Sequence, residues 1–136
     1  MTYLLDVNSL LALGVIQHEF HERVGAWIAT LAKKGIPDLA TCSITELGFV
    51  RVLSQAQQYR ISVVQAREIM ILLKASKLVR FSFISDGQDI SNLPKWVKTA
   101  KQTTDGHLVE LARANGAQLA TIDGKIPGSF LIPARR

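Results

Sequence analysis

The segment from Thr103 to Asp123 constrains the fold of this 136-residue chain more strongly than any other stretch. Its apolar residues, including Leu108 and Leu111, recur at the spacing of one helical face. Gly116 then ends the predicted helix, because glycine tolerates the left-handed backbone that a helix C-terminus often requires. Residues 117–122 alternate well enough to predict a strand. The segment therefore predicts a helix, a tight turn and a strand in succession.

Two acidic residues mark the ends of this unit. Asp105 falls at the N-terminus of the helix, where Thr103 or Thr104 is expected to cap the first turn, and Asp123 follows the strand. Helices of a parallel α/β layer run back against the strands, so a helix start and a strand end lie at the same edge of the sheet. Ligand sites of open α/β sheets occur at that edge. The sequence therefore predicts that the two carboxylates come together.

The rest of the chain repeats the alternation of strands and helices. The predicted strands are residues 3–5, 39–42, 79–84 and 130–132. The first predicted helix is capped by Asn8 or Ser9 and reaches Ile16. The other predicted helices are residues 19–33, 43–53, 62–73 and a short one over 96–101. Such alternation implies parallel strand pairing with helices on both faces. We expect a single α/β domain over residues 1–136, with three layers and a mostly parallel central sheet.

Two further acids are predicted at the same edge of the sheet. Asp6 ends the first strand, and Glu46 lies in the first turn of the helix that follows the second strand. Each acid also has a purely structural interpretation. Glu46 completes a capping-box pattern with Ser43, Asp105 suits a helix N-terminus, and Asp123 suits a turn. Asp6 is the exception, because a carboxylate directly after an apolar strand is expected to be partly buried and to need a cation nearby.

Taken together, the acids favour a metal site. At an effective dielectric constant of about 20, two like charges about 4 Å apart repel by roughly 4 kcal/mol, so clustered carboxylates need a cation or must take up protons. Apart from Lys125, no Lys or Arg lies within three positions of Asp6, Asp105 or Asp123. Oxygen ligands suit Mg²⁺ or Mn²⁺ better than zinc. Such an ion can activate water and neutralise the charge that develops on a phosphate.

The composition indicates the kind of binding partner and the cellular compartment. Sixteen Lys and Arg against eleven Asp and Glu give a net charge of +5, which favours a polyanion such as nucleic acid. The single cysteine, Cys42, cannot form an internal disulfide, in agreement with a reducing cytoplasm. No apolar run approaches the roughly 18 residues of a membrane helix, and the N-terminus lacks the basic region of a signal peptide. We expect a cytoplasmic protein.

Three segments carry a family resemblance. LLDVNSLLAL at the start, TCSITELGFVRVL in the middle and TTDGHLVELARANGAQLATID near the end resemble the PIN-domain ribonuclease toxins known as VapC. The resemblance spans nearly the whole chain, in the order of the family. It implies a small metal-dependent endoribonuclease that forms a homodimer and is inhibited by a cognate antitoxin, which also binds operator DNA.

The resemblance also implies roles for individual residues. Asp6 and Asp105 are the expected principal metal ligands, and Glu46 and Asp123 are expected to complete the acidic pocket, directly or through water. The remaining expected contributors are Asn8, which would orient substrate or a metal-bound water, and the supporting hydroxyls of Thr104 and Thr121. One departure is Gly106, which stands where the family pattern suggests Ala and is expected to loosen the start of the helix.

Other residues support weaker hypotheses. Lys95, Lys98 and Lys101 recur every three residues and are candidate RNA contacts, although such a run is also typical of a solvent-exposed helix face. His18 and His21 are expected to be exposed rather than to form a metal pair.

Two alternative functions remain. A phosphatase that forms an aspartyl-phosphate is disfavoured, because it needs a second acid two residues after Asp6, where this chain has Asn8. The other alternative is a catalytically weak domain of the same fold that acts as a protein- or nucleic-acid-binding module.

Overall fold

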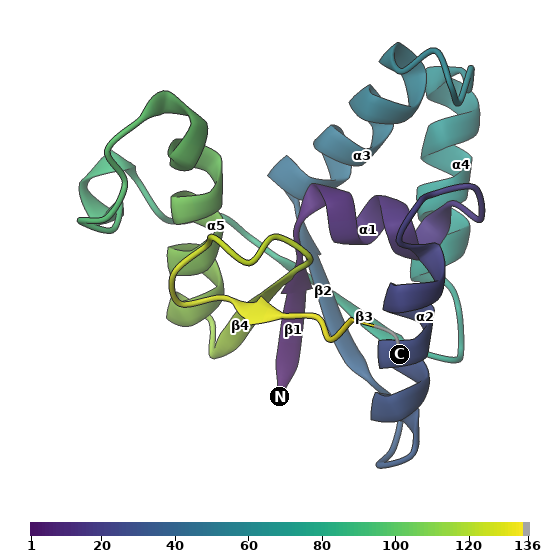
Figure 1. Ribbon diagram of the computed structural model, residues 1–136, viewed down its shortest axis with the longest axis horizontal. Helices are drawn as coiled ribbons and strands as arrows, with labels where there is room; N and C mark the ends of the chain where they lie inside the picture. The colour runs from purple at the N-terminus through teal and green to yellow at the C-terminus, as the bar shows by residue number, and fades with distance from the viewer. Residues whose placement is uncertain (135–136) are drawn as a thin grey trace.

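A computed structural model describes residues 1–134 as a five-stranded sheet with helices on both faces (Figure 1). The strands are β1 (Thr2–Leu5), β2 (Asp38–Cys42), β3 (Arg80–Ile84), β4 (Ala117–Thr121) and β5 (Phe130–Leu131). The α-helices are α1 (Val7–Gly14), α2 (His21–Ala32), α3 (Ser43–Gln55), α4 (Val63–Lys74) and α5 (Thr103–Ala114), and two 3₁₀ helices are η1 (Ile90–Asn92) and η2 (Ala100–Gln102). No helix in this part of the chain is long and apolar enough to cross a membrane.

The strand order places the start and the end of the chain side by side. The order across the sheet is β3-β2-β1-β4-β5, and every pair is parallel. The chain builds outward from β1 to β2 and β3, then crosses back to add β4 and β5 on the other side. The direction of winding therefore reverses between β1 and β4, and the crevice at such a reversal is where open α/β sheets bind ligands.

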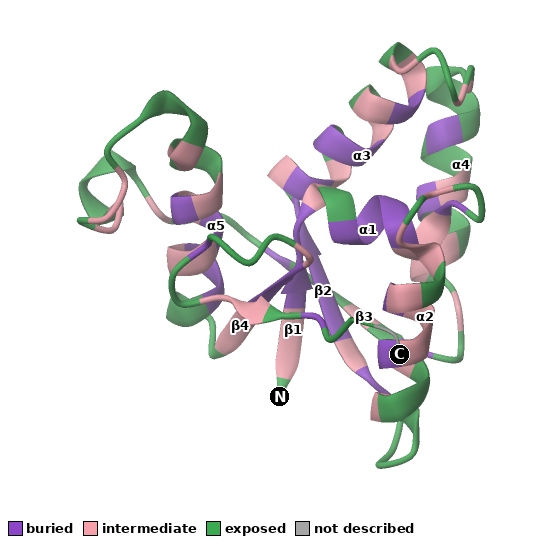
Figure 2. Cartoon of the chain, viewed as in Figure 1, coloured by how far each residue is buried: buried purple, intermediate pink, exposed green. Residues whose placement is uncertain are grey.

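Two apolar cores follow from the alternation of side chains along the strands. Leu4 packs on one face in a cluster with Leu108 and Leu111 of α5. Leu5 packs on the opposite face in a cluster that includes Phe49, where α1 to α4 cover the sheet. Figure 2 shows this burial along the central strands and the inner sides of the helices. The predicted three-layer α/β fold is confirmed, and the pairing is parallel throughout the described sheet.

The helix caps differ from the sequence prediction. Asp6, not Asn8 or Ser9, caps α1, because its side chain accepts a hydrogen bond from the Ser9 N–H at 2.8 Å. Helix α3 begins after Cys42, whose N–H donates to the hydroxyl of Thr45 at 3.0 Å.

Helix α5 also starts without the predicted side-chain cap. It follows directly on η2, and the Thr103 hydroxyl donates back to the Ala100 carbonyl at 2.8 Å. Backbone continuity from the 3₁₀ turn therefore replaces the threonine cap.

The predicted helix over residues 96–101 is wrong. Residues 95 and 96 form a turn, and only Ala100–Gln102 is helical, as 3₁₀. The Gln102 side chain accepts hydrogen bonds from the N–H groups of Lys98 (2.7 Å) and Thr99 (3.2 Å), which holds this segment in an irregular path.

Gly106 has a different role from the one expected. It is buried in a regular α5, and a Cβ at this position would overlap Cγ2 of Val97. The missing side chain therefore lets the segment before α5 pack closely against the helix, rather than loosening the start of α5.

Candidate active site

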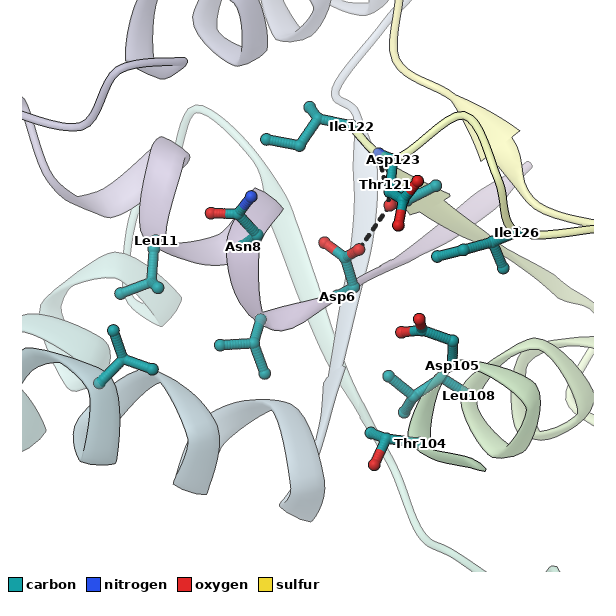
Figure 3. A pocket seen from close by; sticks show the side chains of 12 residues that line it. Asp6, Asn8, Leu11, Thr104, Asp105, Leu108, Thr121, Ile122, Asp123 and Ile126 are labelled. Atoms are coloured by element: carbon teal, nitrogen blue, oxygen red, sulfur yellow. Dashed lines mark hydrogen bonds between the residues drawn. The ribbon is translucent and has the colours of Figure 1, made fainter. Parts of the chain in front are cut away.

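Three of the four predicted acids converge at the crevice between β1 and β4. Asp6 follows β1, Asp123 follows β4, and Asp105 lies in the first turn of α5. Their side chains line one pocket of about 420 Å³ and face a common space in Figure 3. Asn8, Thr104 and Thr121 line the same pocket. The convergence of acids from opposite ends of the chain therefore occurs where the topology predicts it.

Asp6 is held in a fixed orientation. The residue is 7% exposed, and each of its carboxylate oxygens accepts a hydrogen bond: Oδ1 from the Ser9 N–H at 2.8 Å and Oδ2 from the Thr121 hydroxyl at 2.5 Å. The Thr121 oxygen also accepts the N–H of Asp123 at 3.0 Å (Figure 3). One buried hydroxyl thus connects the acid after β1 with the backbone of the acid after β4.

The negative charges of the pocket are not balanced by a cationic side chain among the described lining residues. Burial raises the pKa of Asp105, and the negative charges of Asp6 and Asp123 raise this pKa further. The described residues that line the pocket include three carboxylates and no Lys, Arg or His. Lys125 is exposed and contributes only its backbone N–H, which donates to an oxygen of Asp123 at 2.9 Å. The pocket therefore concentrates negative charge without a protein cation to balance it.

The donor set suits a hard divalent ion. Carboxylate oxygens, with hydroxyl and amide oxygens beside them, are the ligands that Mg²⁺ and Mn²⁺ prefer. No group of three His, Cys, Asp or Glu side chains within residues 1–134 is already arranged around a metal position. The carboxylates thus share a pocket without forming a preassembled three-ligand site in this part of the chain.

Asn8 is held by His18, which was expected from the sequence to be exposed to solvent. The Phe20 N–H donates to Nδ1 of His18 at 3.0 Å, and Nε2 of His18 lies 2.7 Å from Oδ1 of Asn8. Because Nδ1 accepts, Nε2 carries the proton and donates to Asn8, so the ring is neutral. Burial lowers the pKa of His18 and favours this state. No local pattern in the sequence indicates this contact across ten residues.

Glu46 is placed apart from the other three acids. It is not among the residues that line the acidic pocket. Its Oε2 accepts a hydrogen bond from the Thr41 hydroxyl at 2.5 Å and pairs with Nζ of Lys74 at 2.6 Å. The predicted capping interaction with Ser43 is wrong, since α3 begins after Cys42. Glu46 instead joins α3 to α4.

The three candidate RNA-binding lysines lie outside the acidic pocket. Lys95, Lys98 and Lys101 are exposed and lie on the segment that leads into α5. They do not form one helical face, because the segment is a turn followed by a 3₁₀ helix.

Comparison with known proteins identifies the family. No protein-family model matches the sequence. The chain is 35% identical to ribonuclease VapC38 of Mycobacterium tuberculosis over 135 residues, which cover 98% of this chain and 91% of the relative. It is 37% identical to ribonuclease VapC44 of the same species over 132 residues, which cover 93% and 89% of the two chains.

Solved structures of two VapC proteins share the fold of this chain. The Mycobacterium tuberculosis VapC20, a sarcin-ricin loop cleaving toxin, superposes with a TM-score of 0.65 at 15% identity, covering 99% of this chain and 100% of that one. VapBC2 from Rickettsia felis, bound to a promoter DNA fragment, gives 0.60 at 18% identity, with 96% and 97% covered. A parallel α/β fold with acids at the β1–β4 crevice thus defines a PIN-like nuclease domain. The chain belongs to the VapC family of ribonucleases, which confirms the family and the ribonuclease function predicted from the sequence.

Proposed function

We propose that this chain is an endoribonuclease toxin that cleaves RNA at the acidic pocket with the help of Mg²⁺ or Mn²⁺. In this proposal residues 1–136 form one nuclease domain, Asp6 and Asp105 hold the ion, and Asp123 completes the pocket. One observation supports it above the others: three carboxylates share a pocket whose described lining contains no cationic side chain. Bound there, the ion would supply positive charge for the phosphate and acidify a water molecule.

The residues of the chain then position the ion and the substrate. The two hydrogen bonds to Asp6 keep its carboxylate aimed at the pocket. The amide oxygen of Asn8 is engaged by His18, while its amide nitrogen has no hydrogen-bond partner among the described residues and is available to donate to a phosphate oxygen. Thr104 adds a hydroxyl at the rim of the pocket. Glu46 is proposed to contribute directly or through water, which requires its release from Lys74.

Metal binding is expected to stabilise the protein. When Mn²⁺ is added at about 100 times its Kd, the free energy of unfolding should rise by about 2.7 kcal/mol, because only the folded state brings the carboxylates together. Calorimetric titration and thermal unfolding of the full-length protein, with Mn²⁺ and with EDTA, measure this effect. Glu68→Gln, an exposed acid on α4, is the control that should behave like wild type. Absence of both binding heat and a Tm change would support the alternative of a catalytically weak binding module.

The lysine segment is proposed to contact the RNA backbone. Replacing Lys95, Lys98 and Lys101 together by alanine is expected to weaken RNA binding and to lower the slope of log Kd against log salt by about 2, since each phosphate contact to a single strand contributes about 0.7. The matched control replaces Lys33, Lys34 and Lys77, exposed residues in the connections that lead into β2 and β3. It should leave the slope closer to wild type. Equal slopes for the two triple variants would reject the contact.

From membership of the VapC family we propose two protein partners, an antitoxin and a second copy of this chain. An apolar groove of about 310 Å³ lies between α3 and α4. It is lined by Leu47, Val50, Val63, Met70 and Ile71, together with the charged residues Glu46, Arg67 and Lys74. A cognate antitoxin is proposed to lay a hydrophobic segment along such exposed helix faces, and a homodimer is the proposed oligomeric state. Because its substrate is RNA, the protein is proposed to act in the cytoplasm.

The cleavage proposal is tested on cellular RNA. Wild type and Asp6→Ala are induced side by side, and the 5′ ends of total RNA are sequenced. New 5′ ends at defined positions are expected only with wild type. The same new ends in both samples would reject the assignment of Asp6, and their absence from both would reject the proposed activity.

A further inference from the structure

A second pocket shares a wall with the acidic pocket. It also measures about 420 Å³, and Asn8 lines both hollows. Its other walls come from two connections that are distant in sequence: residues 17–20 between α1 and α2, and residues 58–59 between α3 and α4. A ligand that occupied both pockets would therefore pass over Asn8.

The lining of the second pocket suits an uncharged planar group. Phe20 and Tyr59 supply aromatic rings, and Gln17 and Gln58 supply side-chain amides that form no hydrogen bond to any residue within 1–134. Among the described residues lining this pocket there is no Lys or Arg, and Glu19 is an acid. A carboxylate repels phosphate, whereas aromatic rings and amides recognise nucleobases by stacking and by hydrogen bonding to their edges.

The backbone beside the pocket is in an uncommon conformation. Arg60, directly after Tyr59, has a φ of +51°, which residues other than glycine seldom adopt. Such positions cost energy and cluster at ligand sites. Here the conformation ends the turn that presents Gln58 and Tyr59 to the pocket, where the Tyr59 N–H donates to the Ala56 carbonyl at 3.1 Å.

We infer that the second pocket holds the base of the nucleotide next to the cleaved phosphate, and that Glu19 favours a base with an exocyclic amino group. This inference rests on the proposed function, since it assumes an RNA phosphate in the acidic pocket. The sugar next to that phosphate carries a base, so a base pocket has to adjoin the phosphate site, as this pocket does through Asn8. A carboxylate accepts hydrogen bonds from the amino group of cytosine. Uracil has a carbonyl oxygen in place of that amino group, which a carboxylate repels.

Binding of two RNA homo-oligomers tests the inference without cleavage. Fluorescence anisotropy measures the Kd of labelled oligo(C) and oligo(U), each about eight nucleotides long, for full-length Asp105→Asn protein in the presence of Mn²⁺. Homo-oligomers present the same base to the pocket in every register. Oligo(C) is expected to bind at least about fivefold more tightly than oligo(U), the lower end of what one base contact provides. Adding Glu19→Gln should bring the ratio close to one, because an amide both accepts and donates.

Matched variants separate recognition from general effects. Adding Glu68→Gln, which removes the same charge from α4, should keep the ratio of the Asp105→Asn parent. Tyr59→Leu should weaken both oligomers by about tenfold with little change in the ratio, and Tyr59→Phe should restore binding, because stacking does not depend on the hydroxyl. An unchanged ratio in Glu19→Gln, or unaltered binding in Tyr59→Leu, would overturn the base pocket. RNA cleavage that persists in Asp105→Asn would instead overturn the proposed active site, whatever the ratio.

Discussion

Asp105→Asn is expected to lower kcat for RNA cleavage by about 10³-fold. Asp105 faces Asp6 and Asp123 across the pocket, and its carboxylate is one of the two proposed metal ligands. An ion that contributes about 4 kcal/mol to the transition state contributes about three orders of magnitude in rate, which weakened binding would remove. Cleavage of a labelled RNA under single-turnover conditions measures the loss. Glu46→Gln should lose much less, because its carboxylate pairs with Lys74 outside the pocket.

The same substitution is expected to make the metal-free protein more stable at neutral pH. Burial and two neighbouring charges raise the pKa of Asp105 above its ordinary value of 3.8, so the ionised form is disfavoured in the folded state. This penalty is absent below the unfolded pKa and is fully present above the folded one. Asparagine should remove on the order of 1 kcal/mol at pH 7, a small value because Asp105 is partly exposed and screened by solvent.

Thermal unfolding in EDTA distinguishes this account from a general surface effect. The Tm of Asp105→Asn should exceed that of wild type at pH 7, and the difference should shrink as the pH falls towards 4. Glu68→Gln should show no such pattern, since Glu68 is exposed on α4. A lower Tm for Asp105→Asn at pH 7, together with full RNase activity, would contradict the proposed role of the carboxylate cluster.

Thr121→Val is expected to have the second-largest effect, although Thr121 need not touch the substrate. The substitution keeps the shape of the side chain and removes the hydroxyl that donates to Asp6 and accepts the Asp123 N–H. The loss of partners for a buried carboxylate oxygen should cost about 2 to 3 kcal/mol of stability. Cleavage should fall by about 10- to 100-fold, as when a group that orients a metal ligand is lost.

The conservative variant Thr121→Ser provides the control. It retains the hydroxyl and should keep most of the activity, at a smaller cost from the lost methyl group in a fully buried site. Chemical denaturation gives the free energy of unfolding, and Mn²⁺ titration gives the metal affinity of each variant. If Thr121→Val retains both wild-type metal affinity and wild-type cleavage, the hydrogen bond to Asp6 does not position the ligand.

The convergence of Asp6, Asp105 and Asp123 was predictable because it depends on topology. Strand and helix periodicity identify a parallel α/β layer, and in such a layer strand ends and helix starts share one edge. The three acids occupy such positions in the sequence, so topology brings them to one edge. Glu46 occupies such a position too, but it pairs with Lys74 and does not line the pocket. Leu4 and Leu5 are both buried, as expected for a short apolar strand that is covered on both faces.

The partners of Glu46 and Asn8 were not predictable in this way. Lys74 is 28 residues from Glu46, and its approach depends on how α3 and α4 pack against each other. His18 reaches Asn8 only because the connection after α1 folds back over the start of that helix. The lysine spacing in residues 95–101 even favoured a helix, whereas the Gln102 side chain holds the backbone in another path.

The sequence by itself therefore determined the fold class, the edge of the sheet that carries the acids and the family of the protein. The tertiary structure alone decided that three acids rather than four line the pocket, that a buried threonine joins two of them, and that a second pocket adjoins the first at Asn8. The physical reason is one of range. Periodicity and chain direction act between neighbouring residues and fix the elements, whereas hydrogen bonds and ion pairs depend on contacts between elements that form only once the layers pack.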